Sequence, residues 1–302
     1  MFRRLLAGAA SAVLATTVLT ACSPAPENTP SAACVPKHTF PTLKKGVLTV
    51  STYALPPFSV LRNQELTPDG VPIGDDGTLE GVDGDILAEI AANECLTLEI
   101  NSTAAAAVLS TVRAGGADVG AANWYRTVER AQILDLTAPI YTDQLAIISA
   151  DGTTDFSQLK GRRVATVLGY QYVADLRDYF GEGLVLFNSP LTMFNELKRG
   201  NIDAAIDTVG VGAEFVRDTA LRVETAKPNE AIAASLEPGQ SAFLVQQGKA
   251  ELLAALNANI KELRASGRLA EILEKYGLDP RPPSPGSPAC SVERTEIRRS
   301  PG

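Results

Sequence analysis

Short apolar runs alternate along this chain with longer segments in which apolar residues recur every three or four positions. The short runs predict buried β-strands, and the longer segments predict helices with one apolar face. Strands that alternate with helices in this way favour an α/β fold. The predicted strands cover residues 47–51, 96–100, 117–122, 144–149, 163–167, 184–187, 202–206, 221–224 and 242–245.

Capping and turn residues mark the predicted helices. Asp83 can cap a helix that presents Ile86 and Ile90 on one face, because a carboxylate accepts hydrogen bonds from a first helical turn. Residues 62–80 are rich in Gly, Pro and Asp and predict a loop. Further helices are expected at residues 103–115, 173–179, 189–199, 211–217, 250–265 and 268–276.

One local pattern occurs twice in the chain. Asp118 begins a predicted buried strand after a Gly turn, and Asn123 follows five residues later. Asp203 and Thr208 repeat this spacing. In open α/β sheets, ligands bind beyond the carboxyl ends of the strands. The repeat therefore suggests two lobes whose strand ends face one cleft, and coincidence within an α/β composition is the alternative.

The composition is that of a globular protein long enough for two lobes. Of the 302 residues, 45% are apolar and 21% are charged, and the formal net charge is -8. This balance excludes the basic surface expected of a nucleic-acid-binding protein. The single histidine, His38, leaves no basis for histidine-based catalysis or a multi-histidine metal site. We expect neither a metal nor a cofactor.

The N-terminus predicts export and a lipid anchor. Two arginines precede an apolar run over residues 5–19, which is too short for a convincing spanning helix. The run ends in Leu-Thr-Ala-Cys, which resembles the lipobox of bacterial lipoproteins and implies cleavage before Cys22 and its diacylation. Residues 1–21 would then be a signal peptide and residues 22–34 a flexible tether. The alternative is an ordinary signal peptide cleaved after Ala21.

Three cysteines remain after Cys22, namely Cys34, Cys95 and Cys290. An exported compartment permits disulfides, and an odd number leaves one thiol over. We favour a bridge between Cys34 and Cys290, which would join the two ends of the folded chain. A bridge between Cys34 and Cys95 stays open.

Four segments carry motifs in a specific order between residues 44 and 278. They are Gly-Val-Leu-Thr-Val at 46–50 with Leu-Pro-Pro-Phe at 55–58, Gly-Val-Asp-Gly-Asp-Ile-Leu at 81–87, Thr-Val-Glu-Arg at 127–130 with Pro139 and Tyr141, and Leu-Lys-Gly-Arg-Arg-Val at 159–164 with Gly169. Together these motifs resemble the bacterial solute-binding proteins of the polar-amino-acid type, family 3, which are the receptors of ABC importers.

The resemblance implies an α/β fold like that of type II periplasmic binding proteins. Two lobes of mostly parallel sheet, with helices on both faces, would be joined by two crossing strands. Lobe 1 would comprise residues 35–143 and 239–280, lobe 2 residues 144–238, and residues 281–302 would form a Pro-rich tail. The ligand would lie between the lobes, which would close over it by a hinge movement.

The resemblance also implies that Arg130 grips the carboxylate of the ligand. A guanidinium suits this role because its paired donors match the two carboxylate oxygens. The alternative is a surface arginine that pairs with Glu129 or Asp135.

Groups from both lobes would surround that carboxylate. Asn123 and Tyr125 occupy positions where the family places polar side chains and backbone donors, and Trp124 between them either lines the cleft or fills lobe 1. In lobe 2, a turn precedes a helix whose free N–H groups favour an anion. The turn residues are Gly169, Tyr170 and Gln171.

Three positions depart from the family's pattern and weaken the case for a standard α-amino acid. The usual ammonium-binding Asp would stand at Thr208, whereas the acid here is Asp207. Neighbours in a strand point to opposite sides, and which of the two faces the cleft stays open. Leu55 and Val82 replace the expected aromatic platforms, so Tyr53, Trp124 or Tyr170 would have to stack on the ligand.

The implied function is that of a lipid-anchored receptor at the outer face of the cell membrane. It would be a monomer that binds an amino-acid-like carboxylate and delivers it to the permease of an ABC importer, without catalysing a reaction. A ligand-sensing lipoprotein that signals to a membrane partner would have the same cleft. The fold also hosts enzymes similar to cyclohexadienyl dehydratase, but no catalytic constellation stands out in this sequence.

Overall fold

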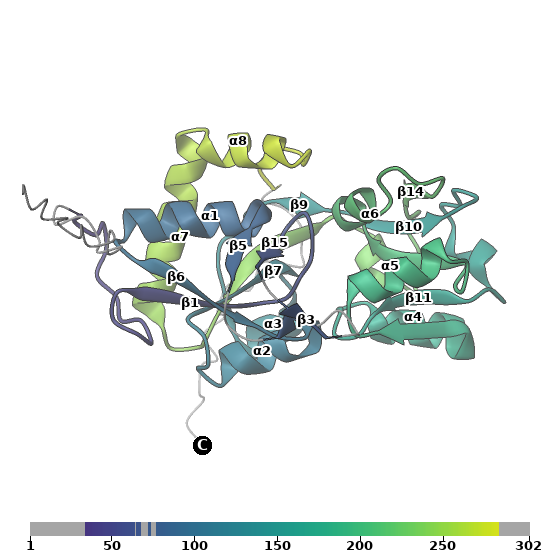
Figure 1. The fold of residues 1–302 in the computed structure, drawn as a ribbon, viewed down its shortest axis with the longest axis horizontal. Coiled ribbons are helices and arrows are strands. Elements are labelled where there is room, and N and C mark those ends of the chain that lie inside the picture. The colour runs from purple at the N-terminus through teal and green to yellow at the C-terminus, as the bar shows by residue number, and fades with distance from the viewer. Residues whose placement is uncertain (1–33, 64, 68–71, 74–76, 284–302) are drawn as a thin grey trace, which may run out of the picture. The chain divides into compact units, whose positions relative to one another are not determined.

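Two β-sheets form the framework of the computed structural model, which describes residues 34–63, 65–67, 72–73 and 77–283 (Figure 1). The chain from Val35 onward makes one compact unit. The predicted signal peptide, the tether and the Pro-rich tail lie largely or wholly outside the described residues.

The first sheet has six strands, in the order β6-β1-β7-β15-β8, and β9 pairs with the opposite end of β15 from β8. β1 is parallel to β6 and β7, whereas β15 is antiparallel to each of its three partners. The strands are β1 (Val47–Thr52), β6 (Thr97–Ser102), β7 (Val119–Tyr125), β8 (Asp135–Leu136), β9 (Thr142–Asp143) and β15 (Gly239–Val245).

Five helices accompany this sheet and cover both of its faces (Figure 1). α1 contacts β6 and β7, α2 contacts β1 and β7, and α7 and α8 pack on α1. The helices are α1 (Gly81–Asn93), α2 (Ala105–Arg113), α3 (Val128–Ile133), α7 (Ala250–Ala265) and α8 (Arg268–Lys275). We call the first sheet with these helices lobe 1.

The second sheet has five strands, in the order β12-β11-β13-β10-β14. β11 is parallel to β12 and β13, and β10 is antiparallel to β13 and β14. We call this sheet with its three helices lobe 2. Its elements are β10 (Leu145–Ser149), β11 (Val164–Val167), α4 (Val173–Phe180), β12 (Leu184–Phe187), α5 (Pro190–Lys198), β13 (Ala204–Thr208), α6 (Val209–Phe215) and β14 (Arg222–Thr225).

The chain crosses between the lobes twice. β9 pairs in the first sheet and is followed almost directly by β10 in the second, and β15 later brings the chain back. Because β10 and β15 each enter a sheet from the other lobe, each runs against the remaining strands of its sheet. The sheets are therefore mixed, with one reversed strand each, and two crossing strands join the lobes as predicted.

Burial on both faces explains why the strands read as continuous apolar runs. All residues of β10 and β11 are buried. The periodic segments predicted as helices instead bury one stripe, such as Leu269, Ile272 and Leu273 of α8. Strands buried on both faces thus appear as apolar runs in the sequence, and helices buried on one face appear as apolar residues at a helical spacing.

Two local predictions are wrong. The described part of the predicted loop at 62–80 contains short antiparallel strand pairs, and the strand predicted at 117–122 continues to Tyr125 as β7. Helices predicted from caps fare better: Ser189 caps α5, and its hydroxyl accepts a hydrogen bond from the Thr192 N–H. The short elements are β2 (Val60–Arg62), β3 (Glu65–Leu66), β4 (Pro72–Ile73), β5 (Thr78–Glu80), η1 (Phe156–Leu159), η2 (Gly181–Gly183) and η3 (Ala233–Ser235).

Candidate ligand-binding site

A pocket lies at the carboxyl ends of β7 and β13 and receives side chains from both lobes. It encloses about 350 Å³ of space between atoms, part of which is open to solvent. Asn123 and Thr208, which the repeated sequence pattern singles out, both line it. We call this pocket the cleft; its lining residues are Tyr53, Leu55, Ala122, Asn123, Trp124, Tyr125 and Arg130 of lobe 1, and Tyr170, Gln171, Tyr172, Asp207, Thr208 and Val211 of lobe 2.

Arg130 is a buried cation in the cleft and not a surface residue. It lies on α3, whose N-cap is Thr127, and its side chain is held by lobe 1. Nη1 donates to the Tyr125 carbonyl oxygen at 2.6 Å, and the guanidinium carbon lies 4.7 Å from the centre of the Trp124 ring. Among the described residues, no carboxylate lies within ion-pair distance of this guanidinium, so the predicted alternative of pairing with Glu129 or Asp135 is wrong.

Burial lowers the pKa of Arg130 to about 10, because removal from water disfavours the charged form. The nearby Tyr53 and Tyr125 act in the opposite direction. Arg130 therefore stays protonated at neutral pH and presents a positive charge that no described carboxylate pairs with directly. An anionic group of a ligand is the natural partner for such a guanidinium.

The irregular end of β7 brings its residues into the cleft. Ala122 and Asn123 adopt positive φ angles of 99° and 51°, which are uncommon for residues with a side chain. The buried carboxylate of Asp83 accepts hydrogen bonds from both of their N–H groups, at 2.8 and 2.9 Å, and from the Tyr141 hydroxyl. The prediction that Asp83 caps its helix is therefore wrong, because α1 begins at Gly81 and the N-cap is Glu80.

Three consecutive side chains of β7 line the lobe 1 wall. Nδ2 of Asn123 donates to Asp143, and Nε1 of Trp124 donates to the Ala121 carbonyl oxygen. The ring of Tyr125 lies against Gly239, where an added Cβ would be only 2.0 Å from the ring. The polypeptide can therefore place Tyr125 here only because residue 239 has no side chain.

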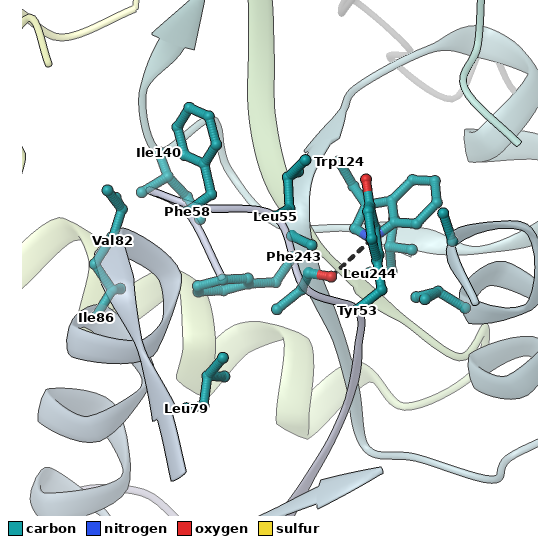
Figure 2. Close-up of a cluster of buried hydrophobic side chains, with 14 of the residues drawn as sticks. Tyr53, Leu55, Phe58, Leu79, Val82, Ile86, Trp124, Ile140, Phe243 and Leu244 are labelled. Atoms are coloured by element: carbon teal, nitrogen blue, oxygen red, sulfur yellow. Dashed lines mark hydrogen bonds between the residues drawn. The ribbon is translucent and has the colours of Figure 1, made fainter. Parts of the chain in front are cut away.

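Tyr53 and Leu55 complete this wall, whereas Val82 does not reach it. The rings of Tyr53 and Trp124 meet edge to face, with centroids 6.1 Å apart (Figure 2). Val82 lies with Ile86 on the buried face of α1 and is fully buried in the core (Figure 2). The prediction that Val82 belongs to the ligand site is thus not supported by its position, because the first turn of α1 directs it into lobe 1.

The predicted turn of lobe 2 lines the cleft with two of its three residues. Tyr170 and Gln171 face the cleft, and the next residue, Tyr172, joins them. Gly169 lies behind them with a φ of +94°, and a Cβ there would come within 2.8 Å of the Ala106 backbone of lobe 1. The glycine therefore permits the close approach of the two lobes beside the cleft.

Asp207 and Thr208 both line the cleft, which answers the question that strand alternation left open. Oδ1 of Asp207 accepts the Thr208 N–H at 2.8 Å, whereas Oδ2 is buried without a hydrogen-bond partner. The Thr208 hydroxyl caps α6 through the Val211 N–H. Burial raises the pKa of Asp207 well above its usual range, and the hydrogen bond from the Thr208 N–H opposes this effect. The Tyr170 hydroxyl, which is near but forms no hydrogen bond of normal geometry, also lowers the pKa.

Asp143 supports the cleft from the crossing strand β9. Its carboxylate accepts hydrogen bonds from the N–H groups of Gln144 and Gly210 and from Nδ2 of Asn123. Burial nevertheless raises its pKa to about 6, and the Thr208 hydroxyl is the strongest of the opposing hydrogen-bond contributions. Asp143 thus links groups of both lobes at the point where the chain crosses.

Protonation of Asp143 predicts a pH dependence of stability. Because its folded-state pKa of about 6 exceeds the value of 3.8 for an unperturbed Asp, its contribution is fully present below about pH 4 and is lost as the pH rises through 6. The loss amounts to about 3 kcal/mol. Asp143→Asn cannot ionise and should not show this loss. The difference in unfolding free energy between the variant and wild type, measured by denaturant titration, should therefore rise by up to about 3 kcal/mol between about pH 4 and pH 8.

Asp151→Asn provides the control, because hydrogen bonds from Arg162 and Ser149 lower the pKa of that carboxyl. Its difference from wild type should stay nearly constant between about pH 4 and pH 8, because a carboxyl with a lowered folded-state pKa gains its contribution below the unperturbed value of 3.8. A flat difference for Asp143→Asn would contradict the proposed burial of that carboxylate.

Three lining residues were not predicted from the sequence: Ala122, Tyr172 and Val211. Ala122 precedes the predicted Asn123, and Val211 follows the predicted Thr208 by three residues. Only the left-handed bend of β7 and the start of α6 reveal that they face the cleft. Tyr172 follows two predicted turn residues and precedes Val173, the first residue of α4. A turn one residue longer than expected would have included it.

Cys34 and Cys95 are both disulfide-bonded. This agrees with the pairing of Cys34 and Cys95 that the sequence left open, and not with a Cys95 thiol left over. Cys290, the partner in the favoured pairing, and Cys22, the predicted lipidation site, lie outside the described residues.

The described residues contain neither a helix suited to span a membrane nor a cluster suited to hold a metal ion. No helix there combines the length and apolarity that crossing a membrane requires. No group of three or more Asp, Glu, His or Cys side chains in the same residues is placed to hold a metal ion.

The chain matches known proteins over most of its length. A family model described as bacterial extracellular solute-binding proteins, family 3, matches residues 49–279. The L-cystine-binding protein TcyJ of Escherichia coli (strain K12) is 24% identical over 217 residues, which cover 68% of this chain and 77% of that protein.

Solved structures share the fold at low sequence identity. The amino-acid ABC transporter substrate-binding protein AbpA of Streptococcus pneumoniae Canada MDR_19A, bound to L-arginine, has a TM-score of 0.65 at 23% identity, over 77% of this chain and 94% of that one. The ancestral amino-acid-binding protein AncCDT-1, a precursor of cyclohexadienyl dehydratase, has a TM-score of 0.63 at 21% identity, over 76% and 95%. These matches identify the two-lobed α/β fold as that of type II periplasmic binding proteins.

Proposed function

Since the chain belongs to the bacterial extracellular solute-binding proteins of family 3, we propose that it is a receptor that binds an amino-acid-like carboxylate in the cleft and delivers it to an ABC importer. The observation that carries the proposal is the buried guanidinium of Arg130, which has no carboxylate within ion-pair distance among the described residues. Asp207 on the opposite lobe supplies an unpaired acceptor for an ammonium group. Opposite charges on the two walls match a zwitterion.

The names of the related proteins support an amino acid as the ligand class. TcyJ is named for L-cystine, and the AbpA structure contains L-arginine. The position of Asp207 in the cleft, with Oδ2 unpaired, answers one of the three reasons that the sequence gave for doubting a standard α-amino acid. An α-carboxylate on Arg130 and an α-ammonium on Asp207 would satisfy both buried charges.

We place the protein at the outer face of the cell membrane, held there by diacylation of Cys22 after removal of residues 1–21. Mass spectrometry of membrane-extracted protein tests this directly, because the processed N-terminus should carry a diacylglyceryl group on that thiol. A protein that begins at Cys22 without lipid would contradict the anchor and leave the cleft proposal intact.

A thermal-shift screen tests the receptor function. Purified protein is mixed with amino acids, opines, amines and small peptides. A ligand that binds the folded state should raise the Tm, because at 100 times its Kd it adds about 2.7 kcal/mol to the unfolding free energy. A set without any shift would contradict the proposal. Turnover of a cyclohexadienyl substrate would instead favour an enzyme on this fold, and signalling without import would favour a sensor.

A side chain added at Gly210 is expected to hinder closure of the lobes. This residue lies on α6 of lobe 2, and a Cβ there would meet the Phe58 ring of lobe 1 at 2.8 Å. The ring cannot yield easily, because it is fully buried and stacked on Tyr141. Gly210→Ala should therefore keep the lobes apart and weaken ligand binding by about tenfold or more in calorimetry, since closed-state contacts are lost.

Gly212→Ala on the same helix is the matched control. A Cβ at residue 212 would meet Ile148 and Val223, which both belong to lobe 2. This substitution should lower the Tm and leave affinity nearly unchanged. Equal affinity losses in the two variants would show that Gly210 acts through the stability of lobe 2 and not through closure.

A further inference from the structure

The charged groups of the cleft limit which side chain its ligand can have. Among the described lining residues, Arg130 and Asp207 are the charged ones. If the proposed function holds, the α-carboxylate and the α-ammonium of an amino acid occupy these two groups. A charge on the ligand's side chain would then be buried without an opposite charge, which is strongly unfavourable.

Asp143 does not supply the missing countercharge. It is not among the residues that line the cleft, and its carboxylate already accepts hydrogen bonds from Gln144, Gly210 and Asn123. Its carboxylate is therefore already engaged by three donors of the protein. A basic side chain would find no free carboxylate beyond Asp207.

An adjoining groove contains acidic residues that do not line the cleft. The groove is lined in part by Glu129 and Asp175. Tyr125, Gln171 and Tyr172 line both the groove and the cleft, so the two spaces border each other at these side chains. A basic side chain held within the cleft itself would meet no acid other than Asp207 among the described lining residues.

The remaining walls offer uncharged hydrogen-bonding groups. Besides Oδ2 of Asp207, five uncharged buried polar atoms of the cleft make no hydrogen bond of normal geometry, although the Tyr125 hydroxyl lies near Asn123 and the Tyr172 hydroxyl near Thr166. Polar groups of this kind are normally satisfied in a functional complex. The five atoms are the side-chain oxygens of Asn123 and Gln171 and the hydroxyls of Tyr125, Tyr170 and Tyr172. The α-carboxylate would already bind Arg130, and the α-ammonium would already bind Asp207. Their remaining hydrogen-bonding positions are too few to satisfy all five uncharged groups.

We propose that the ligand is an α-amino acid whose side chain is uncharged and forms hydrogen bonds, such as an amide or a hydroxyl, and that acidic and basic amino acids are excluded. This inference rests on the proposed amino-acid receptor function. It separates this chain from the AbpA structure, which contains L-arginine.

Calorimetry with near-isosteric ligands tests the charge rule. The probes are L-glutamine against L-glutamate, L-asparagine against L-aspartate, and L-lysine, L-arginine, L-serine and L-threonine. At least one uncharged probe should bind. Its charged counterpart should bind at least about 100-fold more weakly, and so should L-lysine and L-arginine. A charged amino acid that binds as tightly as the best uncharged one would overturn the inference while supporting the receptor function. Absence of binding throughout the panel would overturn the inference, and the wider thermal-shift screen would still decide the receptor function.

Single hydroxyl deletions test the hydrogen-bonding rule. Tyr125→Phe, Tyr170→Phe and Tyr172→Phe are compared for the best uncharged polar ligand and for L-alanine. At least one variant should weaken the polar ligand about tenfold more than L-alanine, since a site built to hydrogen-bond a group rejects a ligand that lacks it. Tyr179→Phe, which lies on α4 against Phe156 and outside the cleft lining, should change neither affinity. Equal effects on both ligands in all three cleft variants would overturn the rule.

Discussion

Replacing Arg130 with alanine is expected to weaken ligand binding by at least about 100-fold and to leave both lobes folded. The reason is that the carboxylate of the ligand would stay buried in the cleft without its charge partner, a loss of about 2–5 kcal/mol. Folding should survive because the guanidinium contributes one hydrogen bond to the Tyr125 carbonyl and contact with Trp124, and removal of an uncompensated buried charge offsets part of that loss. Calorimetry measures the affinity, and circular dichroism with thermal unfolding measures the fold.

Two further variants separate charge, geometry and general damage. Arg130→Lys keeps the charge but removes the paired donors, so it should recover only part of the affinity. Arg217→Ala removes an exposed arginine that pairs with Glu214 on the surface of lobe 2, and it should bind ligand like wild type. An unchanged affinity in Arg130→Ala would refute the role of the guanidinium.

Asp207→Asn is expected to act in opposite directions on stability and binding. Burial raises the folded-state pKa of Asp207 well above that of an unfolded chain, so its stabilising contribution exists at low pH and is lost as the pH rises. At about pH 7 the substitution should therefore increase the unfolding free energy of the ligand-free protein by about 1–3 kcal/mol. Binding should fall by about 100-fold or more, because the ligand's ammonium loses its carboxylate.

Thr208→Val distinguishes the acid from its neighbour in the strand. It removes the hydroxyl that caps α6, which should cost about 1 kcal/mol of stability. It leaves the carboxylate of Asp207 in place, so most of the affinity should remain. A larger loss of affinity in Thr208→Val than in Asp207→Asn would assign the ammonium site to Thr208 and contradict the account.

The sequence predicted most of the framework because its signals are local. The strand at residues 184–187 and the helix at 250–265 were placed at their observed bounds. Arg130 and the turn that begins at Gly169 were found through motif spacing. Arg130 lines the cleft, and Gly169 lies beside it. Periodicity, caps and motifs are properties of neighbouring residues, and they survive folding when the tertiary structure agrees with them.

The errors arose where the partner of a residue is remote in the sequence. Asp83 looks like a helix cap by local rules, yet its carboxylate holds N–H groups about forty residues away at Ala122 and Asn123. Those bonds allow the left-handed bend that extends β7 into the cleft, and no local pattern encodes them.

Val82 shows an error that the sequence could have prevented. Its spacing from Ile86 and Ile90 follows the helical repeat, which places it on the core face of α1. The family position suggested a ligand contact, but the periodicity of the chain itself indicated burial. Tyr172 shows the reverse case, since only the observed start of α4 at Val173 reveals that the turn includes it.

A thermodynamic cycle between Arg130 and the carboxylate of the ligand is the most direct test of the central claim. Calorimetry would measure the best amino acid of the screen and its primary amide against wild type and Arg130→Ala. If the guanidinium holds the carboxylate across the cleft, the amide should lose affinity for the wild type but little for the variant, with a coupling free energy of about 2 kcal/mol or more. Losses that simply add, with no coupling, would mean that residue 130 and the carboxylate do not meet.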